Sequence, residues 1–289
     1  MDTKEILKKV RSIEIKTKGL SNHIFAGEYN TAFKGRGMTF SEVREYEIGD
    51  DLRTIDWNVT ARYNSPFVKV FEEEREITLM LMVDVSSSSS FGTNKRFKRE
   101  LVSEISAVLA FSAIKNNDKV GVIFFSDKIE KFISPSKGKK HILRIIKEIL
   151  TFESTSKKTN IKKALEYFNR VTKKRSICFL LSDFFDSDFF EPVKLSAKRH
   201  DLVAVNTLDS RELEIPNVGL LSLQDSEEDN EILVDSSDRK FRRNFKNKQL
   251  SRLETLKKEL SLCGADYIQL LTQEDIISPL INFFKNRKK

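Results

Sequence analysis

The sequence has little of several residue types that would point to particular classes of protein. Its 289 residues include 2 cysteines, 5 prolines, 10 glycines and 1 tryptophan. Cys178 and Cys263 each lie among apolar residues, a pattern typical of buried reduced thiols rather than of a disulfide framework, so we expect a cytoplasmic protein. No uncharged apolar run reaches the roughly 20 residues of a transmembrane helix. We therefore expect neither secretion nor membrane insertion.

Motifs of two large enzyme classes are also missing. No two glycines have the spacing of a phosphate-binding GxxxxGK[ST] loop, and the glycine-rich dinucleotide fingerprint is absent. A serine hydrolase would need G-x-S-x-G and a positioned histidine. The three histidines, His23, His141 and His200, stand apart from any candidate nucleophile, and we expect them at the surface or at an interface. Nucleotide hydrolysis and serine hydrolysis are disfavoured.

The positive charge is confined to one end of the chain. The formal net charge is +8, and the residues from Arg239 onward contain 13 Lys and Arg against 5 Asp and Glu, which accounts for all of it. Such a segment attracts nucleic acid, anionic membranes or acidic proteins. We interpret it first as the solvated face of a helix.

The order of elements predicts the fold class. Residues 1–75 read as a short helix followed by turns and short strands, and residues 76–289 as one α/β domain. The run 77–83 is apolar and uncharged, as a strand buried on both faces requires. Further strands alternate with helices, which predicts a doubly wound, mostly parallel sheet. The expected strands are 77–83, 120–125, 177–181, 202–205 and 267–271; the expected helices are 97–115, 139–150, 160–171, 191–200 and 239–262, with a final helix after the last strand and an inserted hairpin near 217–235.

Small oxygen-bearing side chains follow two of these strands. Asp84, Ser86 and Ser88 come after the first strand, and alternation in an extended segment points all three the same way. Asp183 follows the strand 177–181, and Thr159 precedes a helix. Ligands of open α/β sheets bind at the carboxyl ends of strands. Two carboxylates with three hydroxyls suit Mg²⁺, whereas a zinc site would need His or Cys nearby. Each residue taken alone would also serve as an ordinary cap or turn residue.

Together these five residues resemble the metal-ion-dependent adhesion site of von Willebrand factor A (VWA) domains. The match consists of Asp84-Val85-Ser86-Ser87-Ser88, Thr159 before its helix, and Ser182-Asp183. The resemblance implies a divalent cation, Mg²⁺ or another such as Mn²⁺ or Ca²⁺, held directly or through water. It also implies that one coordination position is left for a carboxylate of a partner protein.

A second resemblance lies upstream, in segments 35–40, 44–57 and 61–62. They are similar to the signature of the bacterial domain of unknown function 58 family, in which this segment precedes a VWA-like domain. The family is often encoded beside MoxR-type AAA+ ATPases, which implies such an ATPase as a cytoplasmic partner, and no catalytic reaction comes with it. The residues singled out are Arg44, Tyr46, Gly49, Asp50, Asp51, Arg53, Asp56, Trp57 and Arg62.

We interpret this signature as a structural brace between the N-terminal segment and the α/β domain. Gly49-Asp50-Asp51 reads as a turn in which a carboxylate accepts backbone N–H bonds. We expect Arg53, Asp56 and Arg62 to form paired charges beside Trp57. Direct contact of Arg53 or Arg62 with a partner is the alternative.

Two other functions stay open. A Mg²⁺-dependent phosphatase or nuclease would use Asp84 and Asp183 together with Asp186 and Asp188, although Ser86 stands where a phosphoaspartyl site has a second acid and no Lys or His is evident as a stabiliser or base. Nucleic-acid binding would use the basic C-terminal helix. There Phe241 and Phe245 are four residues apart and predict packing on the sheet. Its basic residues are Arg239, Lys240, Arg242, Arg243, Lys246 and Lys248.

The loop after the strand 177–181 is rich in phenylalanine, with Phe184, Phe185, Phe189 and Phe190 around its two aspartates. These rings would either rim a protein-binding surface or pack beneath the loop, and we favour packing. The sequence as a whole predicts a non-enzymatic interaction module that uses a metal to capture an acidic residue of a partner.

Overall fold

The structure, a computed structural model, describes residues 12, 37–63, 65–74, 77–93, 96–224 and 231–287. Apart from residue 12, these fall into two compact units, one within Phe33–Glu76 and the other within Ile77–Lys289. The predicted short N-terminal helix lies outside the described residues. The division of the whole chain at residue 75 stays a prediction.

The smaller unit is a two-stranded antiparallel sheet whose connection is partly helical. Strand β1 (Gly37–Glu45) pairs with β2 (Phe67–Glu74), with a bulge between Phe40 and Glu42. A 3-10 turn, η2 (Leu52–Thr54), and the helix α3 (Trp57–Tyr63) lie between the strands. The β-rich character is as predicted. The prediction of turns between the strands is wrong at α3, which is a helix. Asp56 starts this helix, because its Oδ1 accepts the N–H groups of Asn58 and Val59.

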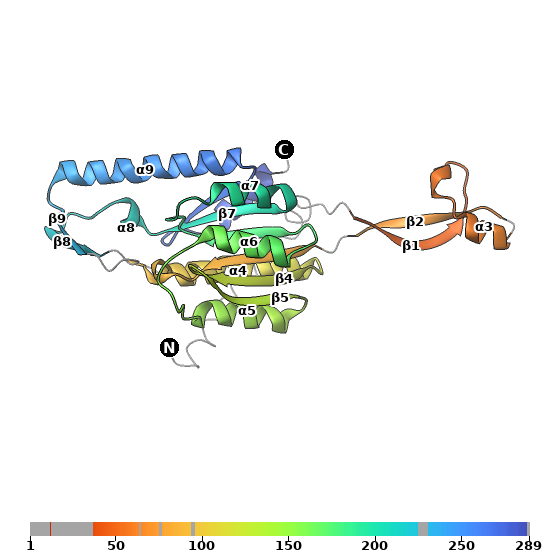
Figure 1. Cartoon of the computed structure of the whole chain (residues 1–289), viewed down its shortest axis with the longest axis horizontal. Helices are drawn as coiled ribbons and strands as arrows, with labels where there is room; N and C mark the ends of the chain where they lie inside the picture. Colours follow the sequence, from red (N-terminus) through yellow and green to blue (C-terminus); the bar gives the residue numbers. More distant parts are fainter. Residues whose placement is uncertain are drawn as a thin grey trace. The chain divides into compact units, whose positions relative to one another are not determined.

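The larger unit is built on a six-stranded sheet (Figure 1) in the order β10-β7-β6-β3-β4-β5. All neighbours are parallel except β5, which runs antiparallel to β4 at one edge. The predicted mostly parallel α/β fold is confirmed. The strands are β3 (Thr78–Asp84), β4 (Lys119–Phe125), β5 (Ile129–Ser136), β6 (Ile177–Ser182), β7 (Asp201–Leu208) and β10 (Asp266–Leu271).

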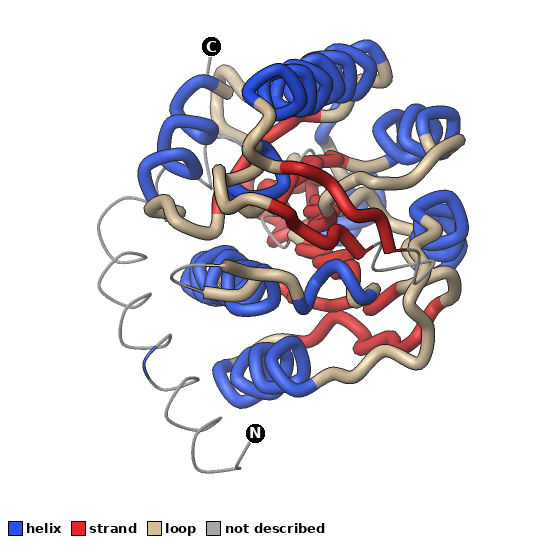
Figure 2. Tube along the Cα trace, turned by 90° about the vertical axis from the view of Figure 1, so that its left-hand side faces the viewer, coloured by secondary structure: helices blue, strands red, loops and turns tan. Residues whose placement is uncertain are grey.

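Helices cover both faces of this sheet, as Figure 2 shows from the end. Within β3, Met80 and Met82 point to one face, where they join a buried cluster with residues of α6, α7 and α9. On the other face, α4 packs on β3 and β4, and Phe284 of α10 meets Phe179 of β6. The helices are α4 (Lys98–Lys115), α5 (Lys139–Thr151), α6 (Ile161–Val171), α7 (Phe190–Arg199), α9 (Arg239–Leu262) and α10 (Ile277–Asn286).

The predicted hairpin insertion is present as a separate two-stranded sheet. Strand β8 (Leu220–Gln224) pairs antiparallel with β9 (Glu231–Asp235), after the short helix α8 (Ser210–Leu213). The helix α9 follows. Its buried residues, Leu253, Leu256 and Leu260, all lie in its second half, whereas Phe241 and Phe245 are half-buried. The core contact of this helix is therefore made by its C-terminal leucines rather than by the two phenylalanines.

Both cysteines are free. Cys178 is fully buried in β6, and burial raises the pKa of its thiol. Cys263 is partly buried and donates to the Phe190 carbonyl. In the described part of the chain, no helix is long and apolar enough to cross a membrane.

One histidine contradicts its expected place at the surface or an interface. His200, at the end of α7, is 3% exposed and lies 4.5 Å from the Phe168 ring, centroid to centroid. Neither of its ring nitrogens has a hydrogen-bond partner among the described residues. Burial, followed by the charges of Arg199 and Arg175, lowers the pKa of His200 to about 4.

This burial predicts a loss of stability in mild acid. The unfolded chain takes up a proton at His200 near pH 6.5, whereas the folded chain does so only near pH 4. The free energy of unfolding should therefore fall as the pH drops from about 7 to 4, by about 3 kcal/mol from this residue. Urea unfolding of wild type and His200→Leu at pH 7 and pH 4.5 checks it. We expect a smaller pH dependence in the variant, and equal pH dependence would contradict the assignment.

Candidate metal centre

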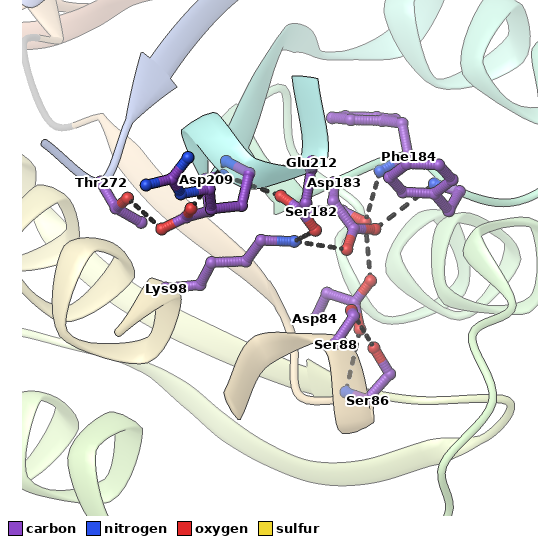
Figure 3. A network of polar contacts seen from close by, with 12 residues as sticks. Asp84, Ser86, Ser88, Lys98, Ser182, Asp183, Phe184, Asp209, Glu212 and Thr272 are labelled. Carbon is purple, nitrogen blue, oxygen red and sulfur yellow. Dashed lines mark hydrogen bonds and ion pairs between the residues drawn. The ribbon is translucent and has the colours of Figure 1, made fainter. Parts of the chain in front are cut away.

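The candidate site lies where the strand order of the sheet reverses. The chain continues from β3 to β4 on one side, and β6 returns to pair with β3 on the other. The carboxyl ends of β3 and β6 therefore flank a topological switch point, the usual ligand position in open α/β sheets. Asp84 ends β3, and Asp183 directly follows β6. Both carboxylates are held near one another (Figure 3) and are buried, with exposed fractions of 5% and 4%.

Asp84 is fixed by hydrogen bonds to both of its oxygens. The Ser86 N–H donates to Oδ1 at 3.0 Å, and the Ser182 hydroxyl donates to Oδ2 at 2.6 Å. The hydroxyls of Ser86 and Ser88 lie 3.1 Å apart. The segment is not extended as predicted, because Ser87–Ser90 form a 3-10 turn, η3. Asp84, Ser86 and Ser88 still gather together, but through this turn rather than by strand alternation.

Asp183 has a different environment, because a lysine lies against it. Lys98 Nζ is 3.0 Å from Asp183 Oδ2, and the Phe185 N–H donates to Oδ1 at 3.3 Å. The nearby Ser88 hydroxyl also acts to lower the pKa of this carboxylate. The sequence around Lys98 gives no sign that this lysine lies at the site.

The two carboxyl groups consequently differ in pKa. Burial, together with the charge of Asp183, raises the pKa of Asp84 to about 7. Burial also acts to raise the pKa of Asp183, but the ammonium of Lys98 outweighs it and lowers that pKa below the usual value. Asp183 is the permanent anion of the pair, and Asp84 becomes fully charged only above neutral pH or beside a cation.

Thr159 does not cap the helix that follows it. Asn160 is the N-cap of α6 and accepts the Lys163 N–H, while Asp186 Oδ2 accepts the Ile161 N–H at 2.7 Å. Thr159 Oγ1 is buried and has no hydrogen-bond partner among the described residues. A buried hydroxyl left unpaired costs free energy unless something else bonds it.

The loop that carries Thr159 is tied to the serine segment. The Ser87 N–H and hydroxyl both donate to the Lys157 carbonyl, at 3.2 and 3.1 Å. The Asn160 N–H donates to the Ser126 carbonyl at the end of β4. Asp84, Ser86 and Ser88 are thus linked by hydrogen bonds. Asp183 lies beside them, and Thr159 is in a loop bonded to the same segment.

The donor set fits a hard cation that needs few protein anions. Within the described residues, no group of three or more His, Cys, Asp or Glu side chains is placed to hold a metal. Carboxylates and hydroxyls are the oxygen ligands of Mg²⁺, which keeps several waters. Asp84, Ser86, Ser88, Thr159 and Asp183 would hold the ion, directly or through water.

The carboxylates that a phosphoesterase would add are engaged elsewhere or exposed. The Asp186 side chain accepts the N–H groups of Ile161 and Ser187, so it fastens the start of α6. Asp188 is exposed, in a left-handed conformation with φ 59°. Lys98, which pairs with Asp183, is buried.

The signature residues of the smaller unit divide into two sets. Arg44 and Asp50 form a two-bonded ion pair at 2.8 and 2.7 Å, and Asp50 also accepts the Glu47 N–H. Gly49 has φ 116°, which the turn before Asp50 requires. The guanidinium lowers the pKa of Asp50. These residues shape the turn, as predicted.

The second set differs from the expectation of paired charges beside Trp57. Asp56 pairs with Lys69 at 3.4 Å, not with Arg53 or Arg62, and this is a correction. Asp51 caps η2 through the Arg53 N–H, and Tyr46 is half-buried. Within this unit Trp57 is 70% exposed, and the side chains of Arg53 and Arg62 are also exposed.

Sheet order and helical cover together define a von Willebrand A-like α/β protein. The family described as "Protein of unknown function DUF58" matches residues 42–254, and the chain belongs to it. An uncharacterised protein of Mycobacterium tuberculosis, Rv1480, is 26% identical over 292 residues, covering 100% of this chain and 92% of that protein.

Solved structures resemble the fold at low sequence identity. An aerotolerance-related membrane protein from Bacteroides fragilis is 16% identical with a TM-score of 0.51, covering 73% of this chain and 98% of that one. The VWA domain of SpRpn10 is 10% identical with a TM-score of 0.39, covering 72% and 94%. At 16% identity, the likeness to the Bacteroides fragilis protein concerns the fold alone.

Proposed function

We propose that this protein is a non-enzymatic interaction module that binds a divalent cation, Mg²⁺ or a similar ion, and captures an acidic residue of a partner. The observation that carries the proposal is the cluster of two buried carboxylates with three hydroxyl residues. Among the residues that the structure describes, Thr159 Oγ1 has no hydrogen-bond partner. A bound ion, or a water, would satisfy an oxygen in that state.

The chain's residues would leave the ion electrophilic. Only Asp84 and Asp183 contribute charge to the shell, and the hydroxyls of Ser86, Ser88 and Thr159 are neutral. A bound ion attracts a further carboxylate when its own protein ligands carry little negative charge. An Asp or Glu from the partner would complete the shell, and the surrounding loops would supply the remaining contact area.

The partner we propose is a MoxR-type AAA+ ATPase or its client, on the ground of the family to which the chain belongs. We place this encounter in the cytoplasm, in keeping with the two free thiols. The phosphoesterase alternative is weakened because the Asp186 carboxylate accepts the Ile161 N–H at the start of α6.

Capture of a purified MoxR-type ATPase tests the proposal. Immobilised wild type should retain the ATPase in Mg²⁺ and release it in EDTA, because the ion bridges the two proteins. Asp84→Ala should not retain it, whereas the matched variant Ser87→Ala should, since the Ser87 hydroxyl bonds the Lys157 carbonyl outside the cluster. Capture that is indifferent to EDTA would contradict the mechanism. Hydrolysis of a phosphate ester that disappears in Asp183→Asn would favour the enzyme instead.

A further inference from the structure

A buried lysine lies inside the candidate metal centre but is not one of its predicted ligands. Lys98 is the first residue of α4, and its side chain is 2% exposed. Its ammonium contacts Asp183 Oδ2 at 3.0 Å and also pairs with Glu212 Oε1. A buried ammonium is tolerated only when it is paired. The site therefore contains a permanent positive charge beside one of its two carboxylates.

This lysine is held in place by a network that reaches two other elements (Figure 3). Glu212 Oε2 accepts the Asp209 N–H at 2.7 Å, in a capping box at the start of α8. Asp209 in turn accepts hydroxyl bonds from Thr93 at 2.6 Å and from Thr272, which follows β10, at 2.7 Å. Because Glu212 is fixed in this way, Lys98 is fixed between two carboxylates.

An ammonium and a divalent cation compete for the charge of the same carboxylate. Asp183 would attract a metal less because Lys98 offsets its charge. The ammonium would also repel the ion, because water screens little in buried space. Glu212 reduces both effects, because it takes up part of the lysine's charge. The two residues thus act on the metal in opposite directions.

We propose that Lys98 is a built-in counter-cation that weakens divalent-cation binding at this site, and that Glu212 sets how strongly it does so. The proposal rests on the proposed function, since it concerns the same metal centre. It makes the metal affinity dependent on the position of α8, which bears Glu212. A weakly held ion is then stabilised most when a partner carboxylate joins its shell.

Paired substitutions test this with Mg²⁺ and Mn²⁺ alone as ligands. In isothermal titration at pH 8, Lys98→Met should bind either ion about 10-fold or more tighter than wild type, because the competing charge is gone. Lys98→Arg keeps the charge and should not show this gain. Glu212→Gln should bind several-fold more weakly. Lys115→Met, an exposed position at the far end of the same helix, is the control for net charge and should match wild type.

Thermal unfolding adds a readout that does not depend on titration heats. Lys98→Met leaves Asp183 and Glu212 without their cation, so its melting temperature should rise steeply with Mg²⁺, by more than that of wild type. If Lys98→Met does not fold, Glu212→Gln, which retains the Lys98–Asp183 pair, carries the test.

The outcomes separate this inference from the proposed function. If wild type binds the ions, Asp84→Ala does not, and the Lys98 and Glu212 variants equal wild type, the counter-cation is overturned and the metal centre stands. If neither wild type nor Lys98→Met binds, the metal centre itself is overturned. If Lys98→Met binds the ions and wild type does not, the counter-cation is supported, and partner capture by wild type does not depend on these ions.

Discussion

Asp84→Ala should abolish the binding of Mg²⁺ and Mn²⁺. Asp84 supplies one of the two carboxylates of the cluster and, through Ser86 and Ser182, organises the hydroxyls around it. Loss of both roles should weaken binding by at least about 100-fold, below detection for an ion held by few anions. Thr159→Ala should also abolish ion binding, because we propose that the Thr159 hydroxyl bonds the ion or its water. Isothermal titration at pH 8 measures both, above the pKa of about 7 at Asp84.

Two neighbouring serines provide a matched control for this experiment. Ser86→Ala removes a hydroxyl of the cluster, whereas Ser87→Ala removes one that bonds the Lys157 carbonyl. Only the first should weaken binding strongly, because the Ser87 N–H still holds the 157 loop. Asp84→Asn preserves the side-chain shape and separates loss of charge from loss of packing. Unchanged Mg²⁺ affinity in Asp84→Ala or Asp84→Asn would show that the ion binds elsewhere.

Most of this centre could be predicted from the sequence, because its parts obey simple geometric rules. Ser86 and Ser88 reach the site through the 3-10 turn η3 and not by the predicted alternation. The two carboxylates do follow simple rules, because Asp84 ends β3 and Asp183 follows a strand that pairs with β3. Both rules concern backbone direction, which hydrophobic patterning reveals. Thr159 stands before a predicted helix and belongs to the same set of oxygen donors in the sequence. That its hydroxyl is unpaired among the described residues is a property of the folded chain.

Lys98 could not be predicted by the same reasoning. It stands between Phe97 and Arg99 in a stretch of basic residues, where a lysine ordinarily faces water. Its burial depends on Asp183 and Glu212, which are 85 and 114 residues away in sequence. Contacts at that separation follow from how the sheet assembles and leave no local pattern.

The fold was predictable where strands are buried on both faces and less so at the edge. Strand β5 was missed because Ile129–Ser136 contains charged residues and Pro135, features of an edge strand that resemble a loop in sequence. Gly121 on β4 leaves room for Pro135 of β5, because a Cβ at this position would lie 2.9 Å from Pro135 Cγ. The helix α3 was missed for another reason: it has only 7 residues and no buried side chain, so it lacks an apolar stripe.

Phe189→Ala should be among the most destabilising single changes in the larger unit, whereas Phe185→Ala should not be. Phe189 is 1% exposed and belongs to the core cluster with Val193 and Leu256. Truncation of a fully buried phenylalanine costs about 3–5 kcal/mol of unfolding free energy. Phe185 is 46% exposed and touches the Arg252 guanidinium, 3.4 Å from the ring centroid. Its removal should cost about 1 kcal/mol or less.

The measurement must follow the unit that contains these rings. The only tryptophan, Trp57, lies in the smaller unit, so its fluorescence would not report this core, and urea unfolding is better followed by far-UV circular dichroism.

Phe189 lies in the loop that Asp183 begins, and Phe189→Ala should therefore weaken Mg²⁺ binding as well. Phe185 lines an open groove of about 670 Å³ with Lys248 and Arg252, so Phe185→Ala should keep both stability and Mg²⁺ affinity while weakening partner capture. Equal destabilisation by the two variants would mean that the loop packs as one layer and presents no ring to a partner.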